Sequence, residues 1–106
     1  MTTVAVIGLG YVGLPLVVEF AKQGRTIGFD IHEGKVAACR AGTDPSRELT
    51  DAQMAEAVHA EYTSNGALLG EADIIIVAVS PHGPYTLGYT RATMAVTVGS
   101  NRATGS

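Results

Sequence analysis

Three glycines near the N-terminus have the spacing of loops that bind phosphate groups. Residues 8–13 read Gly-Leu-Gly-Tyr-Val-Gly. In such a loop the first glycine allows a tight turn, the second lets the backbone approach a pyrophosphate, and the third lets a helix pack against a strand. The N–H groups of Tyr11 and Val12 would then lie at a helix N-terminus, where free donors and the helix dipole favour an anion.

The GxGxxG spacing is weak evidence by itself, so the flanking elements decide whether it forms a site. Residues 3–7 are rich in β-branched residues and predict a buried strand that ends just before the first glycine. Residues 11–23 predict a helix, because Leu14, Val17, Val18 and Ala21 fall on one face. The motif therefore has the strand before it and the helix after it that a dinucleotide site requires.

An acidic residue at the end of the next predicted strand indicates which cofactor binds. Residues 25–30 predict that strand, and Asp30 closes it 22 positions after Gly8. Its carboxylate can accept hydrogen bonds from the adenosine ribose hydroxyls of NAD, and it would repel the 2′-phosphate of NADP. Lys35 is near enough to reach the ribose or pyrophosphate, or it is a solvated lysine of a helix. The candidate cofactor-binding residues are Gly8, Gly10, Tyr11, Val12, Gly13, Asp30 and Lys35.

The remaining pattern alternates helices with strands. Residues 33–41 predict a helix, residues 43–48 a polar loop, and a capping box of Thr50 and Gln53 opens a helix that runs to about residue 60. A short strand at 61–64, a helical turn at 66–70 and an unbroken apolar strand at 74–79 follow. The fold class is therefore α/β: the first half of a Rossmann-like parallel sheet, with helices on both faces and strand order 3-2-1-4.

Composition narrows the other possibilities. A chain of 106 residues suits one small domain, and its net charge of −3 gives no reason to expect nucleic acid. The longest apolar run is far shorter than the ~20 residues that span a bilayer, and no signal peptide is evident, so we expect a cytoplasmic protein without membrane contact. Cys39 is the only cysteine, which excludes an internal disulfide and favours a small buried side chain. No metal-binding pattern is present in the sequence.

Residues 4–16, Val-Ala-Val-Ile-Gly-Leu-Gly-Tyr-Val-Gly-Leu-Pro-Leu, closely resemble the N-terminus of the UDP-glucose/GDP-mannose dehydrogenase family. The pairs Tyr11-Val12 and Leu14-Pro15 are distinctive, since a general Rossmann domain does not require them. Residues 28–31 resemble the second strand of the family. Residues 42–51 and 62–64 are similar to the branch that oxidises UDP-N-acetylhexosamines to uronic acids for surface polysaccharides.

This resemblance implies an enzyme that oxidises C6 of a nucleotide sugar from alcohol to acid and passes two hydrides to two NAD molecules. It also implies a cysteine nucleophile assisted by lysine, asparagine and acidic groups, and a homodimer. All positions that can be carried over here bind cofactor. Cys39 does not match the nucleophile, so a UDP-sugar is expected as a partner of the complete enzyme only, and this chain alone is expected to be inactive.

The resemblance ends near Val79, where the family continues with Pro-Thr-Pro and this chain with Ser80-Pro81-His82. Residues 80–106 contain no acidic residue and are rich in Ser, Thr and Gly. We therefore divide the chain into an NAD-binding half-domain, 1–79, and a tail, 80–106, for which a frameshift or truncation is suspected. Apart from a weak alternation at 94–98, the tail is expected to be coil, which would leave the strand at 74–79 with an open edge.

Two other functions remain open. The chain could be a stand-alone dinucleotide-binding or regulatory module without catalysis, which an ordered tail packed on the sheet would favour. It could also be a fragment of another NAD dehydrogenase, such as a 3-hydroxy acid dehydrogenase. Tyr11-Val12 and Leu14-Pro15 argue against that last possibility.

Overall fold

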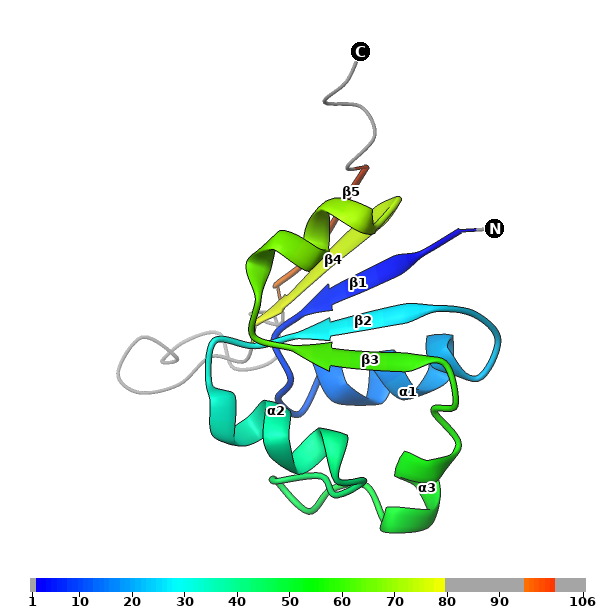
Figure 1. Ribbon diagram of the computed structural model, residues 1–106, viewed down its shortest axis with the longest axis vertical. Helices are drawn as coiled ribbons and strands as arrows, with labels where there is room; N and C mark the ends of the chain where they lie inside the picture. The colour runs from blue at the N-terminus through cyan, green and yellow to red at the C-terminus, as the bar shows by residue number, and fades with distance from the viewer. Residues whose placement is uncertain (1, 80–94, 101–106) are drawn as a thin grey trace.

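One twisted sheet organises the molecule. The computed structural model describes residues 2–79 and 95–100. Its strands are β1 (Val4–Ile7), β2 (Thr26–Phe29), β3 (Ala60–Thr63), β4 (Ile74–Val79) and β5 (Ala95–Ser100). They lie in the order β3-β2-β1-β4-β5 (Figure 1). The order of the first four strands confirms the predicted 3-2-1-4.

The first four strands are parallel and pair in register from their first residues. Val4 of β1 lies between Thr26 of β2 and Ile74 of β4, and Thr26 in turn pairs with Ala60 of β3. The carboxyl ends of β1 and β2 therefore lie side by side. Residues that follow these two strands, the glycine loop after β1 and Asp30 after β2, are brought to the same edge of the sheet.

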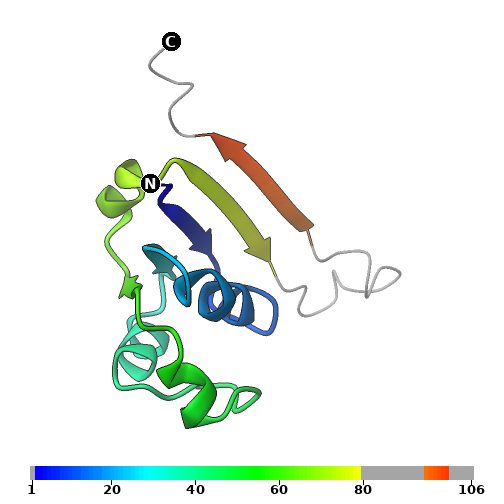
Figure 2. The same cartoon turned by 90° about the vertical axis from the view of Figure 1, so that its right-hand side faces the viewer.

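The three α-helices in the described part of the chain cover one face of the sheet. They are α1 (Gly13–Ala21), α2 (Glu33–Arg40) and α3 (Asp51–Ala55). The apolar face of α1 packs on Val6 and Ile76 of the sheet, and α2 and α3 add Val36 and Met54 to the same core. Figure 2, which turns the view by 90°, shows these helices on one side of the strands. This burial holds the helix that follows the glycine loop in place.

A short 3-10 helix, η1 (Gly66–Glu71), covers the opposite face. Leu68 and Leu69 pack there on a small core that includes Ala5 and Ile27. The prediction of helices on both faces is thus met by α-helices on one face and a single 3-10 helix on the other, across the part of the chain that the structure describes.

Strand β5 corrects the expectation for the tail. It pairs antiparallel with β4, with Ile74 opposite Ser100 and Val79 opposite Ala95. The described part of the tail is therefore a strand instead of coil, and β4 has a partner along the edge that was expected to be open. Backbone pairing with a preformed apolar strand explains why a weakly alternating segment becomes a strand. Residues 80–94 and 101–106, also expected to be coil, lie outside the described residues.

Helix boundaries also differ from the sequence predictions, and α1 and α2 end at Ala21 and Arg40, which is two residues and one residue early. Helix α1 begins at Gly13, two residues after the predicted start, because Tyr11 and Val12 form a turn. Helix α3 ends at Ala55 instead of about residue 60. The chain after it must turn back into β3, and the N–H of His59 bonds to the carbonyl of Ala21 at 3.0 Å. This tertiary bond outweighs local helix propensity there.

Candidate cofactor site

The turn after β1 depends on the absence of a side chain at its first glycine. Gly8 has a φ of +105°, and a Cβ placed there would lie 2.1 Å from the carbonyl oxygen of Ala78 in β4. Its N–H donates to the carbonyl of Phe29 at 2.8 Å, which continues the pairing of β1 with β2. The chain can leave the sheet here only with glycine. This confirms the tight turn predicted for Gly8.

Gly13, the last glycine of the motif, allows the start of α1 to lie against the backbone of Gly8. A Cβ at Gly13 would lie 1.6 Å from the carbonyl oxygen of Gly8 and 3.4 Å from the Cβ of Ala78. The loop therefore folds back on itself, and α1 starts directly above it. The expected reason for this glycine was close packing of helix on strand. The nearest obstacle is in fact the backbone of the loop itself.

The loop leaves backbone donors at the start of α1. The N–H of Leu14 donates to the carbonyl of Gly10 at 3.1 Å, which closes the first turn. Within residues 2–79 the N–H groups of Tyr11 and Val12 donate to no acceptor of the chain. Free donors at a helix N-terminus, together with the helix dipole, attract phosphate oxygens.

Asp30 is tied directly to the glycine loop. Its side chain is buried, with 7% of the residue exposed, and its Oδ2 accepts a hydrogen bond of 2.9 Å from the N–H of Leu9. Its Oδ1 accepts a hydrogen bond of 2.9 Å from the N–H of His32 at the start of α2. Each carboxylate oxygen can accept more than one hydrogen bond, so both remain able to receive a hydroxyl. The bond to Leu9 was missed in the sequence, since no local pattern indicates it.

The glycine loop, α2 and a loop beyond α2 enclose a hollow of about 160 Å³. Leu9, Gly10 and Tyr11 line one side. Lys35, on the first turn of α2, lines it together with Pro45 and Ser46. The structure thus brings Lys35, which is half-buried, to the glycine loop. Of the predicted site residues, Gly10, Tyr11 and Lys35 line this hollow, and Asp30 bonds to Leu9 in its lining.

The loop that carries Pro45 and Ser46 is held by a second buried carboxylate, which the sequence analysis did not single out. Asp44 is 2% exposed and accepts hydrogen bonds from Ser46 (N–H 2.8 Å, Oγ 2.7 Å), Glu48 N–H (3.0 Å) and Leu49 N–H (2.8 Å). Burial raises the pKa of Asp44, but the four hydrogen bonds lower it by more, and the bond from the Leu49 N–H has the largest lowering effect. The pKa of Asp44 is therefore below its ordinary value. The Asp-Pro-Ser order is a turn signal that could have predicted this loop.

Within residues 2–79, the cysteine and the histidines do not line the hollow. Cys39 is buried, as expected, and burial, followed by the charges of Asp44 and Asp30, raises its pKa to about 11. A thiol with such a pKa stays protonated and is a poor nucleophile. His32 and His59 are exposed. Asp30, which closes β2, is the acidic group that lies closest to the motif.

These features fit a dinucleotide. Gly8 and Gly13 leave no space for a side chain in the turn, the N–H groups of Tyr11 and Val12 have no acceptor within residues 2–79, and the buried carboxylate of Asp30 bonds to the same loop. Fold and site together define the first mononucleotide-binding half of a Rossmann fold.

Comparison with known proteins identifies the family. Residues 2–93 match the model of the UDP-glucose/GDP-mannose dehydrogenase family, NAD binding domain, and the chain belongs to this family. NAD is therefore the cofactor of the domain. The match continues beyond Val79, at which the sequence analysis placed the end of the resemblance.

Individual relatives agree with this assignment. A UDP-N-acetyl-D-glucosamine 6-dehydrogenase of Pseudomonas aeruginosa is 46% identical over 76 residues, which cover 72% of this chain and 18% of the relative. Protein CapL of Staphylococcus aureus is 43% identical with the same coverage of both chains. The name of the first relative supports the UDP-N-acetylhexosamine branch. The chain thus spans about a fifth of the length of these relatives.

A solved structure shows the same fold. The UDP-glucose dehydrogenase of the archaeon Pyrobaculum islandicum is 28% identical, with a TM-score of 0.66 over 79% of this chain and 21% of that protein. Among the helices described, none has the length and apolar character needed to cross a membrane.

Proposed function

We propose that this chain binds NAD through the glycine loop and Asp30. In this arrangement the N–H groups of Tyr11 and Val12 hold the pyrophosphate, and the carboxylate of Asp30 accepts the adenosine ribose hydroxyls. The observation that carries the proposal is the 2.9 Å bond from the Leu9 N–H to Asp30. It joins the phosphate-binding loop to the ribose-binding carboxylate, so that both halves of the site have one fixed geometry.

Lys35 contributes a positive charge to the same site. It lines the hollow beside the glycine loop, on the first turn of α2. A cation there attracts the phosphate charge of the cofactor and balances that of Asp30. We include Lys35 among the cofactor-binding residues on this basis.

We propose further that the chain represents the cofactor-binding part of a nucleotide-sugar 6-dehydrogenase, with a UDP-N-acetylhexosamine as substrate of the complete enzyme. The Pseudomonas aeruginosa relative, a UDP-N-acetyl-D-glucosamine 6-dehydrogenase, supports this branch, and bound NAD supplies the hydride acceptor for such an oxidation. The chain alone binds NAD without oxidising a sugar, because its one cysteine is buried and protonated. A homodimer of the complete enzyme and a cytoplasmic location stay predictions.

Calorimetric titration of the 106-residue chain with NAD tests the binding site. Asp30→Ala should weaken NAD binding by ~1–3 kcal/mol, since partners of a charged hydrogen bond are left unmet. Asp51→Ala, which removes an exposed acidic group at the start of α3, is the matched control and should bind NAD as the unchanged chain does. Equal affinity in all three proteins would rule out Asp30 as a ligand.

A second assay addresses catalysis. The chain is incubated with NAD and UDP-N-acetyl-D-glucosamine, and NADH is followed by its absorbance. We expect no NADH above the level of a control without sugar. NADH formation that depends on the sugar would show that the chain carries catalytic groups of its own.

Strand β5 favours a second candidate, a stand-alone dinucleotide-binding module. Its pairing along the whole of β4 gives this strand a partner on both sides. A chain that ends at residue 79 distinguishes the two functions. If the tail completes an independent module, its removal should lower both the stability and the NAD affinity of the chain. An unchanged affinity would favour the dehydrogenase fragment.

A further inference from the structure

The hollow beside the glycine loop has a wall that no cofactor-binding motif accounts for. Pro45 and Ser46 line it together with Leu9, Gly10 and Tyr11 of the glycine loop. They belong to a short segment, residues 44–49, which we call the Asp44 turn. A wall at this place determines how closely a bound cofactor is held against the loop.

The Asp44 turn is built around one buried carboxylate. Asp44 accepts three backbone N–H bonds and one hydroxyl bond from within the turn, at 2.7–3.0 Å. The carbonyl of Asp44 also accepts the N–H of Arg47 at 3.0 Å, and Arg47 has a φ of +63°. A non-glycine residue takes this left-handed conformation only where its surroundings impose it. Asp44 therefore stabilises the conformation of the turn, including the left-handed backbone at Arg47.

The turn is anchored on both sides. Leu49 packs against the core beneath the helices, and the N–H of Thr43 bonds to the carbonyl of Ala38 near the end of α2 at 2.9 Å. Lys35, on the same helix, lines the hollow together with Pro45 and Ser46. The wall is thus connected to the helix that begins after Asp30. Because Asp30 is the residue proposed to bind the adenosine ribose, we assign the wall to the adenosine half of the proposed site.

We propose that Asp44 is a positioning residue of the cofactor site, which holds Pro45 and Ser46 as the wall opposite the glycine loop at the adenosine end of a bound dinucleotide. The inference rests on the proposed NAD site. Asp44 itself is buried under the turn and does not reach the ligand. Its effect on binding comes from the order that it imposes on the two residues of the wall.

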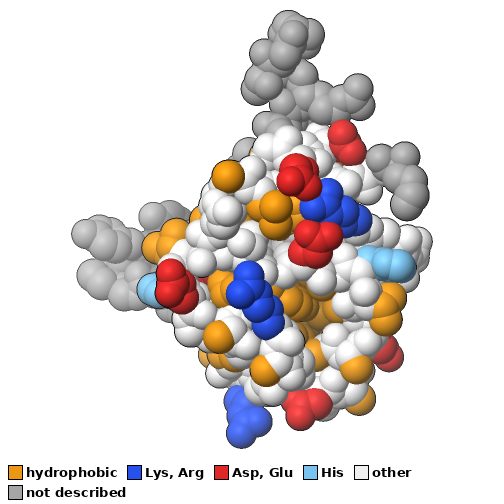
Figure 3. Space-filling model, viewed as in Figure 1, with side chains coloured by type: hydrophobic (Ala, Val, Ile, Leu, Met, Phe, Trp, Pro, Cys, Tyr) orange, Lys and Arg blue, Asp and Glu red, His pale blue; other side chains and the backbone are white. Residues whose placement is uncertain are grey.

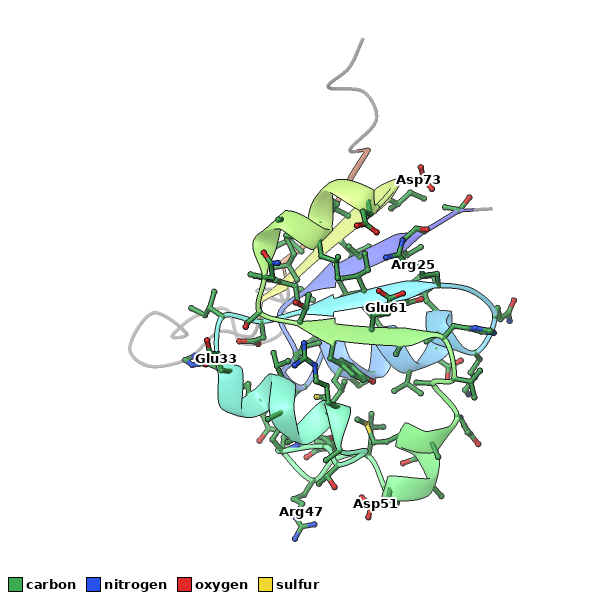
Figure 4. The ribbon with its side chains drawn as sticks, viewed as in Figure 1. Arg25, Glu33, Arg47, Asp51, Glu61 and Asp73 are labelled. Carbon is green, nitrogen blue, oxygen red and sulfur yellow. The ribbon has the colours of Figure 1, made fainter. Side chains whose placement is uncertain are left out.

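Two variants test this role. Asp44→Asn replaces one acceptor oxygen by an N–H donor, which faces N–H groups and cannot bond to them. Pro45→Gly keeps every bond of Asp44 but frees the backbone of the wall, and it decides the question if Asp44→Asn does not fold. Asp51→Asn removes the same charge from an exposed position, which Figure 4 shows at the end of the molecule away from the sheet.

Dissociation constants for NAD and for ADP are measured with the 106-residue chain at a temperature where each variant is folded by circular dichroism. If NAD must order one additional residue of the wall, each of the two variants should bind about tenfold more weakly. ADP should lose affinity by the same factor, because it contains the adenosine half. Asp51→Asn should bind both ligands as the unchanged chain does.

The outcomes separate the two proposals. An unchanged chain that binds neither NAD nor ADP refutes the proposed site, and the role of Asp44 with it. Binding by the unchanged chain that both variants retain in full refutes the role of Asp44 alone. The proposal is also wrong if Asp44→Asn and Pro45→Gly lose no more affinity than the control Asp51→Asn. It is likewise wrong if they bind NAD more weakly but bind ADP as the unchanged chain does. A purely structural Asp44 would lower the unfolding midpoint and leave both constants unchanged.

Discussion

Replacing Gly13 by alanine tests the geometry of the glycine loop most directly. The new Cβ would lie 1.6 Å from the carbonyl oxygen of Gly8 and 2.8 Å from its carbonyl carbon. To reach an ordinary contact of about 3.5 Å, the separation from the oxygen must grow by about 2 Å. Both neighbours are backbone atoms between a strand and a helix that are packed in the core, so neither can move as a flexible side chain would.

Two opposing effects set the size of the change. Alanine is a better helix former than glycine by about 1 kcal/mol, which would stabilise α1. Forcing extra volume into a packed site costs about 1–3 kcal/mol and at times more. Because the clash is with backbone, we expect the second effect to win. Gly13→Ala should therefore lower the free energy of unfolding, measured by urea denaturation.

The same displacement should disturb NAD binding more than stability. The N–H groups of Tyr11 and Val12 lie between the two clashing residues and must move with them. Losing two charge-assisted bonds of about 1.5 kcal/mol or more each predicts NAD binding at least about 100-fold weaker.

Gly34→Ala is the matched control for this change. Gly34 lies in α2, and a Cβ there meets no atom within 4 Å. It should therefore stabilise the chain by up to about 1 kcal/mol through helix propensity alone and leave NAD affinity unchanged. The reasoning fails if Gly13→Ala proves as stable as Gly34→Ala and binds NAD equally well.

Three further changes should have measurable effects. Thr50→Ala removes the capping box of α3 and should cost ~0.5–2 kcal/mol in urea denaturation. Glu71→Gln removes one partly exposed ion pair of Arg25, in which the two side chains are 2.6 Å apart. It should lower the free energy of unfolding by at most ~1 kcal/mol, and 1 M NaCl should abolish this difference. Hydrogen bonds within the turn lower the pKa of Asp44 in the folded chain, so its stabilisation is present above the ordinary pKa of 3.8 and is lost as the pH falls from there through the lowered pKa. The stability difference between the unchanged chain and Asp44→Asn should accordingly shrink when both are measured from pH 6 down to pH 3.

The ion pairs of Arg25 join segments that are distant in sequence. Its guanidinium bonds to Glu61 of β3 at 2.7 and 3.1 Å and to Glu71 of η1 at 2.6 Å. Figure 4 shows the labelled side chains of Arg25 and Glu61 close together. Figure 3, from the same viewpoint, shows basic and acidic side chains gathered on the face toward the viewer. The group lies at the starts of β2 and β3, at the edge of the sheet opposite the cofactor site. A change here should therefore alter stability without altering NAD affinity.

Elements with a strong local pattern could be predicted from the sequence. The strand at 74–79 has the predicted bounds, because six apolar residues follow Asp73 without interruption. The order of the parallel strands followed from right-handed crossovers, which leave few alternatives. The capping box of Thr50 and Gln53 formed as predicted, with both reciprocal bonds present. Each of these rests on residues that are close together in the chain.

Features that depend on distant partners could not be predicted in this way. The end of α3 is determined by the position of β3, and β5 exists because β4 offers it an edge. The position of Tyr62 is similar. A Cβ at Gly28 would lie 2.9 Å from Cδ1 of the Tyr62 ring, so the ring packs where a side chain at Gly28 would lie. Burial also raises the pKa of the Tyr62 hydroxyl to about 12. Local periodicity contains no information about such contacts.

The bond between Asp30 and Leu9 changes how substitutions at Asp30 must be interpreted. A ribose-binding carboxylate would affect only ligands that carry ribose hydroxyls. Asp30 also accepts the N–H of Leu9, so its removal leaves a buried donor unsatisfied inside the glycine loop. Asp30→Ala should therefore weaken the binding of an adenine nucleotide even when its ribose hydroxyls are absent, as in 2′,3′-dideoxyadenosine diphosphate compared with ADP. Equal affinity of Asp30→Ala and the unchanged chain for the dideoxy ligand would show that Asp30 serves the ribose alone.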